Sequence, residues 1–501
     1  MSMIKIGWAE ANITPSKKVS LTGQFAERIS EYVEKPLTVT ALAMECGEEQ
    51  MILVNADLVG VPTKTLQMVR ERLENNQAGL DPMKIVISAI HTHCGPRMEG
   101  SDYSSNHTGT SAGFKYLLAE FLKEGQKYVE AANVSNNPEI ATAEECVELF
   151  VSQAADAILR AWNSRKPGSY VNAFGRAVVG QCRRATYSDG SAQMWGNTDT
   201  ANFVALEGGN DSGIELLYVF DENDQLTGIV ANLACPAQCV QHRLFVSPDF
   251  WGEVKVLLRK RFGEHIFLLP QCSAAGDQCP VDLVRWVEPE TDVHDPNITR
   301  VNPLKRKADP SMFDLAGMRK TGKRIANEII DLFEEGLDEP IKDTVLVHKA
   351  EIMKLPLRRV TMTEYKNAIR QIKEYLDEHP GDVNYENSAQ VQVYVGVVRR
   401  FRLQEILEFI ECEIHTARLG NIAFASNPFE LFLNYGNQIK ARSKAEQTFL
   451  VQLANGVEGY LPTEKAEKGG HYSAFVGSGQ VGHEGGDQLV RYTLSTINGM
   501  F

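Results

Sequence analysis

The sequence predicts an α/β fold in which mixed β-sheets are flanked by helices. Short β-branched runs such as KIVI (84–87) alternate with amphipathic stretches such as TKTLQMVRERLENN (63–76), and no repeat or low-complexity tract interrupts this alternation. Candidate site residues are spread from position 91 to position 460, and they can meet only if the chain folds as one unit. We therefore expect one large domain over residues 1–501.

The N-terminal third shows the alternation most clearly. TALAMEC (40–46) and QMILVNADLVG (50–60) are typical of strands that precede the helix at 63–76. A second helix is predicted by Thr142 and Glu145, which have the spacing of a capping box and precede an apolar periodic run. The polar region from 101 to 140 lies between them, and we interpret it as a lid over the site.

The middle of the chain changes to strands and hairpins. YSDGSAQ (187–193) contains an Asp-Gly turn, and DENDQLTG (221–228) is a second turn between apolar runs. GIVANLACPAQ (228–238) and HIFLLPQCSAAGDQCP (265–280) each end an apolar strand in a loop of small and polar residues. These two loops are predicted site loops.

Residues 361–412 are expected to form an outer helical hairpin. Thr361 and Glu364 make a second capping box, and HPGD (379–382) separates the two apolar periodic segments.

Composition excludes several classes of partner. The 501 residues are 43% hydrophobic and 23% charged with a formal net charge of -14, and no basic run is longer than LRKRF (258–262). A chain of this kind lacks the basic stripe that nucleic-acid binding requires. No signal-peptide core and no apolar run of membrane-spanning length is present, so we predict a cytoplasmic protein with a small-molecule substrate and no membrane partner.

The nine cysteines are interpreted as free thiols. Five of them lie in loop-like segments near the predicted site, without CxxC pairs or zinc-finger spacing: Cys94, Cys235, Cys239, Cys272 and Cys279. The simplest interpretation is that they pack as small buried hydrophobic side chains.

The segment SAIHTHCGP (88–96) follows the predicted strand KIVI. His91 and His93 are two residues apart where this strand ends, so we predict that they lie side by side on one face. Two interpretations stay open: polar loop residues, or a metal ligand beside an acid/base group.

Five motifs, taken in order, resemble the catalytic domain of the neutral (alkaline, non-lysosomal) ceramidase family over nearly the whole chain. SAIHTHCGP is similar to the family's His-Thr-His-Ser-Gly-Pro motif, and AAGDQCP to its Gly-Asp-x-Ser-Pro nucleophile loop. The other three are GWAEANITP (7–15), RLGNIAFASNPFELF (418–432) and LANGVEGYLPTEKAEKGGHY (453–472). The resemblance implies a ceramidase-like fold, and we expect the family's C-terminal β-sandwich to be absent.

The resemblance also implies a zinc site. It makes His91 a zinc ligand, Glu430 the carboxylate ligand and Tyr460 the tyrosine ligand, a donor set that suits zinc. For Glu430 a helix start remains an alternative, because Asn427-Pro428-Phe429-Glu430 has the pattern of an N-cap with a glutamate three residues later.

Two further roles follow from the resemblance. His93 would work beside the nucleophile, and Arg183, with Arg184 as the neighbouring choice, would bind the scissile carbonyl or its oxyanion. Asp277, in the predicted nucleophile loop, is included among the catalytic candidates. His93 would exchange a proton with the attacking group.

The sequence departs from the family at two positions. Pro236 stands where the family has a second zinc-binding histidine, and His242 is the expected substitute, with the thiols of Cys235 or Cys239 as a further choice. Cys279 replaces the family's serine, and it is either a nucleophile or inert packing.

These expectations predict a metal-assisted hydrolase of a small soluble substrate, with an amide placed first and ceramide disfavoured. A glycoside hydrolase on the same scaffold is the alternative, and its carboxylates would come from Asp57, Asp249, Asp277 and Glu430. A non-catalytic binding protein is the third possibility. Aromatic residues near the site loops would suit a sugar face or an acyl chain: Trp195, Trp251 and Trp286.

Overall fold

A computed structural model gives the fold over most of the chain. It describes residues 2–24, 28–74, 79–98, 118–129, 137–285, 313–383 and 391–501. The predicted lid falls largely outside these residues, as does Trp286.

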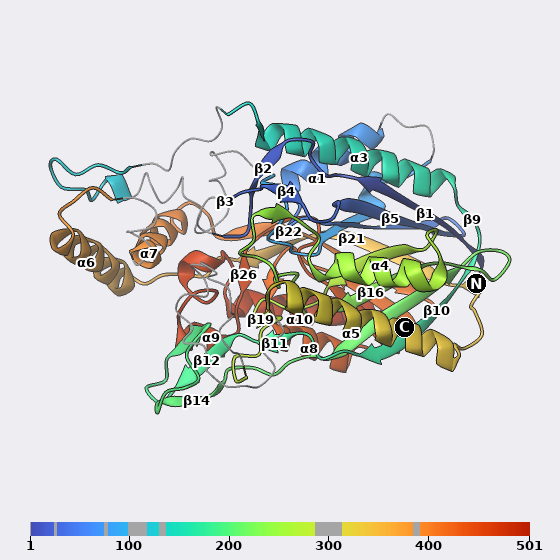
Figure 1. The fold of residues 1–501 in the computed structure, drawn as a ribbon. Helices are drawn as coiled ribbons and strands as arrows, with labels where there is room; N and C mark the ends of the chain where they lie inside the picture. Colours follow the sequence, from blue (N-terminus) through green and yellow to red (C-terminus); the bar gives the residue numbers. More distant parts are fainter. Residues whose placement is uncertain are drawn as a thin grey trace.

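The N-terminal sheet has the strand order β20-β1-β5-β6-β7, with β9 added to β1. Its strands are β1 (Ser2–Asn12), β5 (Thr38–Cys46), β6 (Glu49–Ala56), β7 (Ile85–Ala89), β9 (Lys166–Pro167) and β20 (Asp343–Thr344). The neighbours β6 and β7 are parallel, and α1 (Thr63–Glu74) forms their crossover. Figure 1 shows α1 and α3 (Ala143–Asn163) over one face of this sheet.

The middle sheet has the order β10-β15-β16-β18. Its strands are β10 (Ser169–Arg176), β15 (Gly213–Phe220), β16 (Leu226–Leu233) and β18 (Phe267–Cys272). Strands β16 and β18 are parallel and joined through α4 (Phe250–Phe262), which packs beside α5 (Asp314–Glu335). Both predicted site loops therefore leave the same end of two adjacent parallel strands.

The C-terminal sheet has the order β21-β22-β23-β25. Its strands are β21 (Leu346–Pro356), β22 (Phe409–Leu419), β23 (Ile422–Ser426) and β25 (Gln447–Val451). Helices α8 (Leu433–Arg442) and α10 (His483–Asn498) pack against this sheet. Mixed sheets flanked by helices are thus the architecture of this chain, as predicted.

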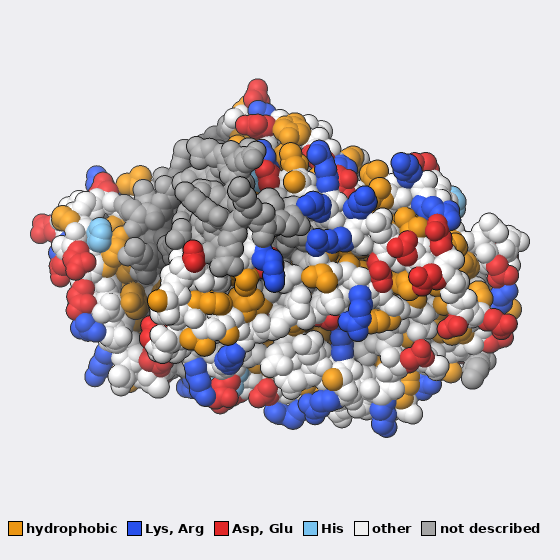
Figure 2. All heavy atoms as spheres, turned by 60° about the horizontal axis from the view of Figure 1, so that its bottom comes forward, with side chains coloured by type: hydrophobic (Ala, Val, Ile, Leu, Met, Phe, Trp, Pro, Cys, Tyr) orange, Lys and Arg blue, Asp and Glu red, His pale blue; other side chains and the backbone are white. Residues whose placement is uncertain are grey.

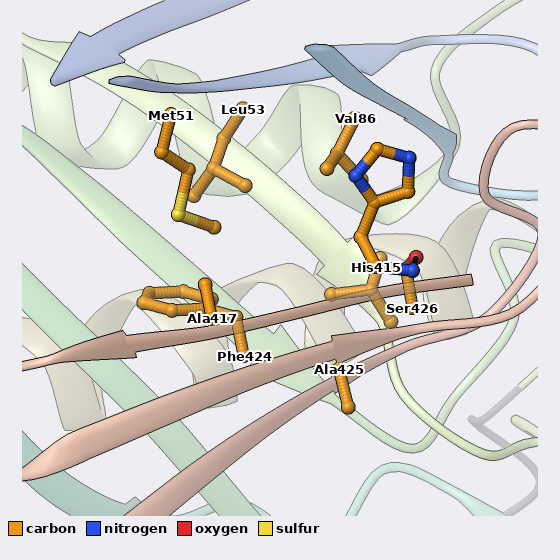
Figure 3. A pocket seen from close by; sticks show the side chains of 9 residues that line it. Met51, Leu53, Val86, His415, Ala417, Phe424, Ala425 and Ser426 are labelled. Atoms are coloured by element: carbon orange, nitrogen blue, oxygen red, sulfur yellow. Dashed lines mark hydrogen bonds between the residues drawn. The ribbon is translucent and has the colours of Figure 1, made fainter. Parts of the chain in front are cut away.

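The three large sheets pack around one shared core. Leu42 and Val86 of the N-terminal sheet, Leu269 of the middle sheet, and Phe424 and Phe449 of the C-terminal sheet belong to one apolar cluster. In Figure 3, side chains of the N-terminal and C-terminal sheets face each other across a cavity of about 10 Å³. Close packing of this kind makes the relative positions of the three sheets rigid.

Short strand pairs connect the large sheets around the site. They are β2 (Lys18–Leu21) with β3 (Arg28–Ile29) and β8 (Ile140–Ala141); β4 (Tyr32–Val33) with β17 (Phe245–Val246); β11 (Gln181–Cys182) with β19 (Gln278–Cys279); β12 (Arg184–Tyr187) with β13 (Ala192–Met194) and β14 (Phe203–Leu206); and β24 (Glu430–Leu431) with β26 (Tyr460–Leu461). Helix α9 (Glu464–Gly469) and two 3-10 turns, Pro82–Lys84 and Val476–Ser478, complete the described elements.

The expected helical hairpin ends earlier than residue 412. Helix α6 (Met362–Glu378) begins at the capping box of Thr361 and packs on α7 (Gln392–Leu403). Residues from Phe409 onward belong to β22 instead, where alternate side chains are buried. Eleven paired residues with β21 override the helical pattern of the sequence there, because pairing and burial outweigh local propensity.

Asn455 joins the C-terminal loop to the edge strand of the N-terminal sheet. Its side-chain Oδ1 accepts from the Ile87 N–H (2.7 Å), and its Nδ2 donates to the carbonyl of Ile85 (3.1 Å) and to Glu413 (2.7 Å). Its own N–H donates to the carbonyl of Ile87 (2.8 Å). The residue has φ +57°, a left-handed conformation that asparagine tolerates better than most residues.

A buried polar chain crosses the same junction. Arg70 pairs with both carboxylate oxygens of Glu413 (2.5 and 2.7 Å), and Glu413 lies 2.6 Å from His415 Nε2. His415 Nδ1 lies 2.9 Å from His348 Nε2, and His348 Nδ1 lies 3.1 Å from the carbonyl of Gln50. Because a carbonyl can only accept, His348 carries a proton on Nδ1. Burial lowers the pKa of His348, which favours the neutral ring in the folded protein.

The surface carries both signs of charge. On the face shown in Figure 2, Lys and Arg side chains alternate with Asp and Glu, and no broad expanse of one sign is present on that face. Among the described helices, none combines the length and the apolar character needed to cross a bilayer.

Replacing Asn455 should destabilise the fold. Asn455→Ala leaves the Ile87 N–H and the Ile85 carbonyl buried without their side-chain partner, so we expect a loss of about 2–4 kcal/mol in the free energy of unfolding. Urea unfolding measures this. Asn223→Ala, in the exposed turn between β15 and β16, is the control and should change stability by less than about 0.5 kcal/mol. Equal effects of the two substitutions would contradict the role of Asn455.

His348 should make the protein less stable as the pH falls. Burial, followed by the charge of His415, lowers the pKa of His348 from 6.5 to about 3. Below about pH 6.5 the unfolded chain takes up a proton that folded His348 does not bind, so stability falls by about 1.4 kcal/mol per pH unit from this group. His348→Gln should flatten the fall between about pH 6.5 and 5, measured by urea unfolding. The exposed His379→Gln should leave the slope unchanged, and an unchanged slope for His348→Gln would refute this account.

Candidate active site

The two histidines of the His-Thr-His segment (91–93) lie in a turn after β7. His91 has φ +66°, so the strand does not continue through the motif and the histidines do not share a strand face. The N–H groups of His91 and Thr92 both donate to the carbonyl of Leu58 (3.0 and 3.2 Å). The imidazole rings of His91 and His93 lie 5.1 Å apart and nearly perpendicular. The turn, rather than the strand, sets the orientation of both rings.

His91 faces a carboxylate with the nitrogen that carries no proton in the neutral ring. Its Nδ1 lies 2.7 Å from the carbonyl of Val59, which can only accept, so Nδ1 carries a proton. Its Nε2 lies 3.2 Å from Glu430 Oε2. A lone pair facing a carboxylate at this distance requires a positive charge between or on the two groups, supplied by a proton or a metal ion.

Glu430 and Tyr460 are neighbours on adjacent strands. They form the register pair of the parallel strands β24 and β26, and Gly276 N–H donates to the carbonyl of Leu431 (2.8 Å). A Cβ at Gly276 would lie 2.3 Å from the Glu430 carbonyl oxygen, so glycine is required for this approach. Burial raises the pKa of Glu430, but His91, Arg183 and Tyr460 outweigh it and the net pKa is lowered.

The helix-start alternative for Glu430 does not describe the structure. Glu430 lies in β24, and helix α8 begins three residues later at Leu433. The Asn427 side chain accepts from Phe429 N–H in a local turn (3.2 Å) rather than capping a helix.

Arg183 and His93 are linked by the amide of Gln238. Arg183 Nη2 donates to the Gly276 carbonyl (3.0 Å) and to the Tyr460 hydroxyl (3.2 Å), and Nη1 donates to Gln238 Oε1 (3.2 Å). Because arginine only donates, Oε1 must face Arg183, and the amide Nε2 then faces His93 Nε2 at 3.0 Å. His93 therefore accepts at Nε2 and carries its proton on Nδ1.

The network includes two buried donors, Arg183 Nε and His93 Nδ1. Neither has a partner in normal hydrogen-bond geometry among the described residues, and the side chain of Gln241 lies near the His93 ring. Burial, followed by electrostatic interaction with His91 and with the guanidinium groups of Arg28 and Arg183, lowers the pKa of His93 well below its usual value, which favours the neutral ring. Buried donors without partners are costly, and at a site they are the groups that a ligand oxygen or nitrogen would satisfy.

Arg184, the neighbouring choice, has a structural role. Its guanidinium is fully buried and pairs with Glu207 through Nε (2.7 Å) and Nη2 (3.1 Å). It also donates to the carbonyls of Gly470 (2.8 Å) and Tyr472 (3.0 Å). Arg183 lies just before β12, and its side chain, unlike that of Arg184, contacts Tyr460 and interacts with Glu430.

The residues present fit a zinc ion with three protein ligands. Imidazole, carboxylate and phenol are all zinc donors, and two ligands about 2 Å from one ion in tetrahedral geometry lie roughly 3.3 Å apart. The observed 3.2 Å between His91 Nε2 and Glu430 Oε2 matches that spacing. Val59 supplies the outer hydrogen bond that orients a ligating imidazole. Three protein ligands with an open fourth position are typical of catalytic zinc.

His242 is not brought to this centre. Its Nε2 lies 3.3 Å from Asp314, and its ring stacks on Phe313 at 4.7 Å. Within the described chain, no three His, Cys, Asp or Glu side chains gather as a metal site, so His91 and Glu430 gain no such third partner. Pro236 therefore leaves the position of the family's second histidine without a replacement among these residue types.

The cysteines are buried thiols. All nine are free and buried. Burial raises the pKa of Cys279 to about 12 although the charge of Arg183 opposes it, and its Sγ donates to the carbonyl of Val281 (3.3 Å). Burial also raises the pKa of Cys235 and of Cys239 well above the usual value. The thiol form of these residues therefore predominates at neutral pH.

The other candidate carboxylates hold backbone groups. Asp277 Oδ1 accepts from Leu433 N–H (2.8 Å) at the start of α8, and the Asp277 carbonyl accepts from Arg183 N–H (2.9 Å). Asp57 accepts from Thr38 N–H (2.8 Å). Asp249 accepts from the N–H groups of Val240 and Phe250 (2.9 and 2.6 Å). Each carboxylate organises a loop or a helix end, and Glu430 is the one that faces His91.

Three contributors were not identified from the sequence. Gln238 lies in a predicted site loop. Its residue type gave no signal, because an amide side chain is not a typical metal ligand or nucleophile. Tyr472 packs on Tyr460 with ring centroids 5.4 Å apart. Tyr472 is the second tyrosine of the last motif, residues 453–472. Gly23 has φ +91°, and a Cβ there would lie 2.3 Å from the His93 ring. No local sequence signal identifies Gly23, since its role depends on that contact.

The two described tryptophans near the predicted site loops, Trp195 and Trp251, are core residues. Trp251 is fully buried in α4. Trp195 is also buried and has φ +56°. Its backbone N–H donates to the Arg183 carbonyl (2.7 Å). Trp195 therefore supports the backbone of Arg183.

The comparisons with known proteins concern the fold. No protein-family model and no curated protein matches the sequence. The crystal structure of neutral ceramidase from Pseudomonas aeruginosa is similar over 100% of this chain and 75% of its own, with a TM-score of 0.66 and 15% identity. A ceramidase structure complexed with C2 covers the same shares with a TM-score of 0.64 and 14% identity. The chain thus has a ceramidase-like fold, which confirms the fold expected from the motifs.

Arg183 and Arg184 should differ in their contribution to stability. Arg184→Met leaves Glu207 buried without its cation and should cost about 3–5 kcal/mol of unfolding free energy. Arg183→Met leaves no directly paired carboxylate behind and should cost less than about 3 kcal/mol. Urea unfolding of both variants checks this. The double variant Arg184→Met/Glu207→Leu should recover part of the loss, and a larger loss for Arg183→Met than for Arg184→Met would contradict the assignment.

Proposed function

We propose that the protein is a metal-assisted hydrolase that cleaves an amide bond of a small substrate. The observation that carries the proposal is the convergence of His91, Glu430 and Tyr460 beside the unpaired donors of Arg183 and His93. The ceramidase-like fold supports hydrolysis as the reaction class. Zinc is the proposed ion, held by His91, Glu430 and Tyr460.

When bound, the ion would act as a Lewis acid on the substrate carbonyl and would make water more acidic. The side chain of Arg183 would stabilise the developing negative charge on the carbonyl oxygen, because its Nε–H is fixed in a buried position without a partner. Its other nitrogens are held by Gln238, Gly276 and Tyr460, so the donor is preorganised.

His93 would manage the protons. Water adds to the carbonyl carbon, the C–N bond breaks, and the departing nitrogen needs a proton while the water loses one. The neutral ring of His93 would first take the proton of the water on Nε2, which carries none, in place of its contact with the Gln238 amide. The resulting imidazolium would then give its Nδ1 proton to the departing nitrogen, so that His93 ends neutral. Gly23 lies against this ring, since a Cβ at position 23 would be 2.3 Å from it.

Water, rather than Cys279, is the proposed nucleophile. The Cys279 thiol is buried, its pKa is raised to about 12, and it donates to the Val281 carbonyl. An attacking thiol must first become a thiolate, and this environment opposes that step. We propose that Cys279 fills space in the core.

The amide is preferred over a glycoside because the cluster offers one carboxylate. Hydrolysis of a glycoside uses a pair of carboxyl groups about 5–9 Å apart with free oxygens. Asp57, Asp249 and Asp277 are occupied by backbone amides, which leaves Glu430. A binding protein without activity would be indicated by stoichiometric zinc with no turnover of any amide or glycoside.

Substitutions should separate metal binding from proton transfer. His93→Ala should lower kcat on the best soluble amide by about 10²-fold or more and leave bound zinc unchanged. His91→Ala and Glu430→Gln should lower both bound zinc and activity. Cys279→Ala should change kcat by less than about threefold, since no covalent intermediate is lost. Steady-state kinetics and metal analysis on the same samples measure these effects.

The exposed His379→Gln serves as the control for histidine replacement. Loss of activity in Cys279→Ala with full zinc content would overturn the water mechanism. Full activity of zinc-free protein, or of His91→Ala, would overturn the metal-assisted reaction.

A further inference from the structure

A polar groove lies beside the candidate active site. One wall is formed by the hairpin of β12 and β13 with the segment that follows it, and the other by residues 469–475, from the end of α9 onward. Its volume is about 560 Å³, within the range of sites that hold small molecules. Figure 1 shows α9 next to β12 and β14 at this end of the molecule.

The groove is lined by neutral hydrogen-bonding groups. Its polar side chains are hydroxyls and amides together with one imidazole, and no Lys, Arg, Asp or Glu is among the lining residues that the structure describes. The lining includes Tyr187, Gln193, Asn197, Asn202, His471 and Phe475. Such a surface offers donors and acceptors in similar numbers, without a net charge.

Much of this hydrogen-bonding capacity is unused. The side-chain amides of Gln193 and Asn202 make no hydrogen bond within the described chain, in contrast to the buried amide of Gln238. Asn197 uses Oδ1 to accept from Asp199 N–H (2.8 Å), which leaves its Nδ2. The Tyr187 hydroxyl donates to the Asn197 carbonyl (3.1 Å) and holds this side of the groove in place.

The groove is tied to the active site through both walls. Trp195 N–H, at the end of the hairpin, donates to the Arg183 carbonyl (2.7 Å). Met194 N–H donates to His471 Nδ1 (3.1 Å), which joins the walls. The residue after His471 is Tyr472, whose ring packs on Tyr460. A molecule in the groove would therefore lie against segments that contact Arg183 and Tyr460.

The chemistry of the lining selects among ligand classes. A phosphate or carboxylate ligand requires cationic donors, which the lining lacks. An acyl chain requires a mostly apolar wall, and burying these amides against it would leave them unpaired. A neutral sugar presents hydroxyls that both donate and accept, and the rings of Tyr187 and Phe475 offer apolar surface to its C–H faces.

We propose that this groove binds a neutral carbohydrate unit. Binding in the groove is independent of the reaction, but the assignment of the unit to the substrate rests on the proposed function. On that basis the substrate is an amide borne on a sugar, with the carbohydrate held between the hairpin and residues 469–475 while the amide lies at His91 and Glu430.

The test compares sugar binding with amide hydrolysis in the full chain. Glucose and N-acetylglucosamine at millimolar concentration are the binding probes, observed by ligand-detected NMR, with glucuronate and octanoate as charged and apolar probes. Gln193→Ala/Asn202→Ala should weaken neutral-sugar binding roughly five- to tenfold, as expected for the loss of two neutral hydrogen bonds. The matched pair Asn223→Ala/Gln225→Ala, in an exposed turn away from the groove, should leave binding unchanged.

The single variant Asn202→Ala and thermal unfolding of each protein separate a loss of contact from a loss of fold. His93→Ala should bind the sugars as the wild type does. In hydrolysis, the double groove variant should raise KM for N-acetylglucosamine and leave KM for a sugar-free acetamide unchanged.

The outcomes separate the two proposals. Sugar binding that depends on Gln193 and Asn202, without hydrolysis of any amide, would support the groove and refute the proposed reaction. Amide hydrolysis without sugar binding, or with equal binding in the groove variant, would overturn the groove and leave the reaction standing. Preferred binding of glucuronate or octanoate at these residues would also overturn it.

Discussion

The attachment of the loop around Asn455 to strand β7 is the constraint on which the site depends. Asn455 hydrogen-bonds Ile87 with its backbone and its side chain, four residues before His91. The same loop continues to Tyr460. It also positions the Glu430 strand through two backbone hydrogen bonds, from Glu430 N–H to the Gly459 carbonyl (2.9 Å) and from Ala454 N–H to the Asn427 carbonyl (3.0 Å). Segments from both ends of the chain thus meet at one edge, and the donor set of His91, Glu430 and Tyr460 results from that junction.

Burial determines which polar groups of the site are available. In a low-dielectric interior each donor and acceptor needs a partner, and most here have one: Gln238 serves Arg183 and His93 at once, and Asp277 serves Leu433. Within the Arg183–Gln238–His93 network, Arg183 Nε and His93 Nδ1 are among the exceptions. Positive φ at His91, Trp195 and Asn455 adds local strain that tertiary contacts hold in place. Both of these donor groups lie beside the proposed metal ligands.

The same burial distinguishes residues that look alike in the sequence. Arg183 and Arg184 are adjacent, yet one faces Tyr460 and the other is sealed against Glu207. The thiol at position 279 is held in its protonated form by its surroundings, so it is not a ready nucleophile. The neutral amides near β13 stay partly exposed, which keeps their hydrogen-bonding capacity open to a ligand. Environment, more than residue type, assigns the role of each group.

Local patterns in the sequence determined several features, because each depends on neighbours within a few residues. These are the alternating architecture, the capping boxes at Thr142 and Thr361, the Asp-Gly hairpin, and the strand before the His-Thr-His segment. The motifs also selected His91, Glu430 and Tyr460 through resemblance. Tertiary structure alone decided the end of the second hairpin helix, the separation of His242 from the centre, the contact of Gly23 with the His93 ring and the link through Gln238. These features arise from contacts between residues tens to hundreds of positions apart, whose burial and pairing energies exceed any local preference.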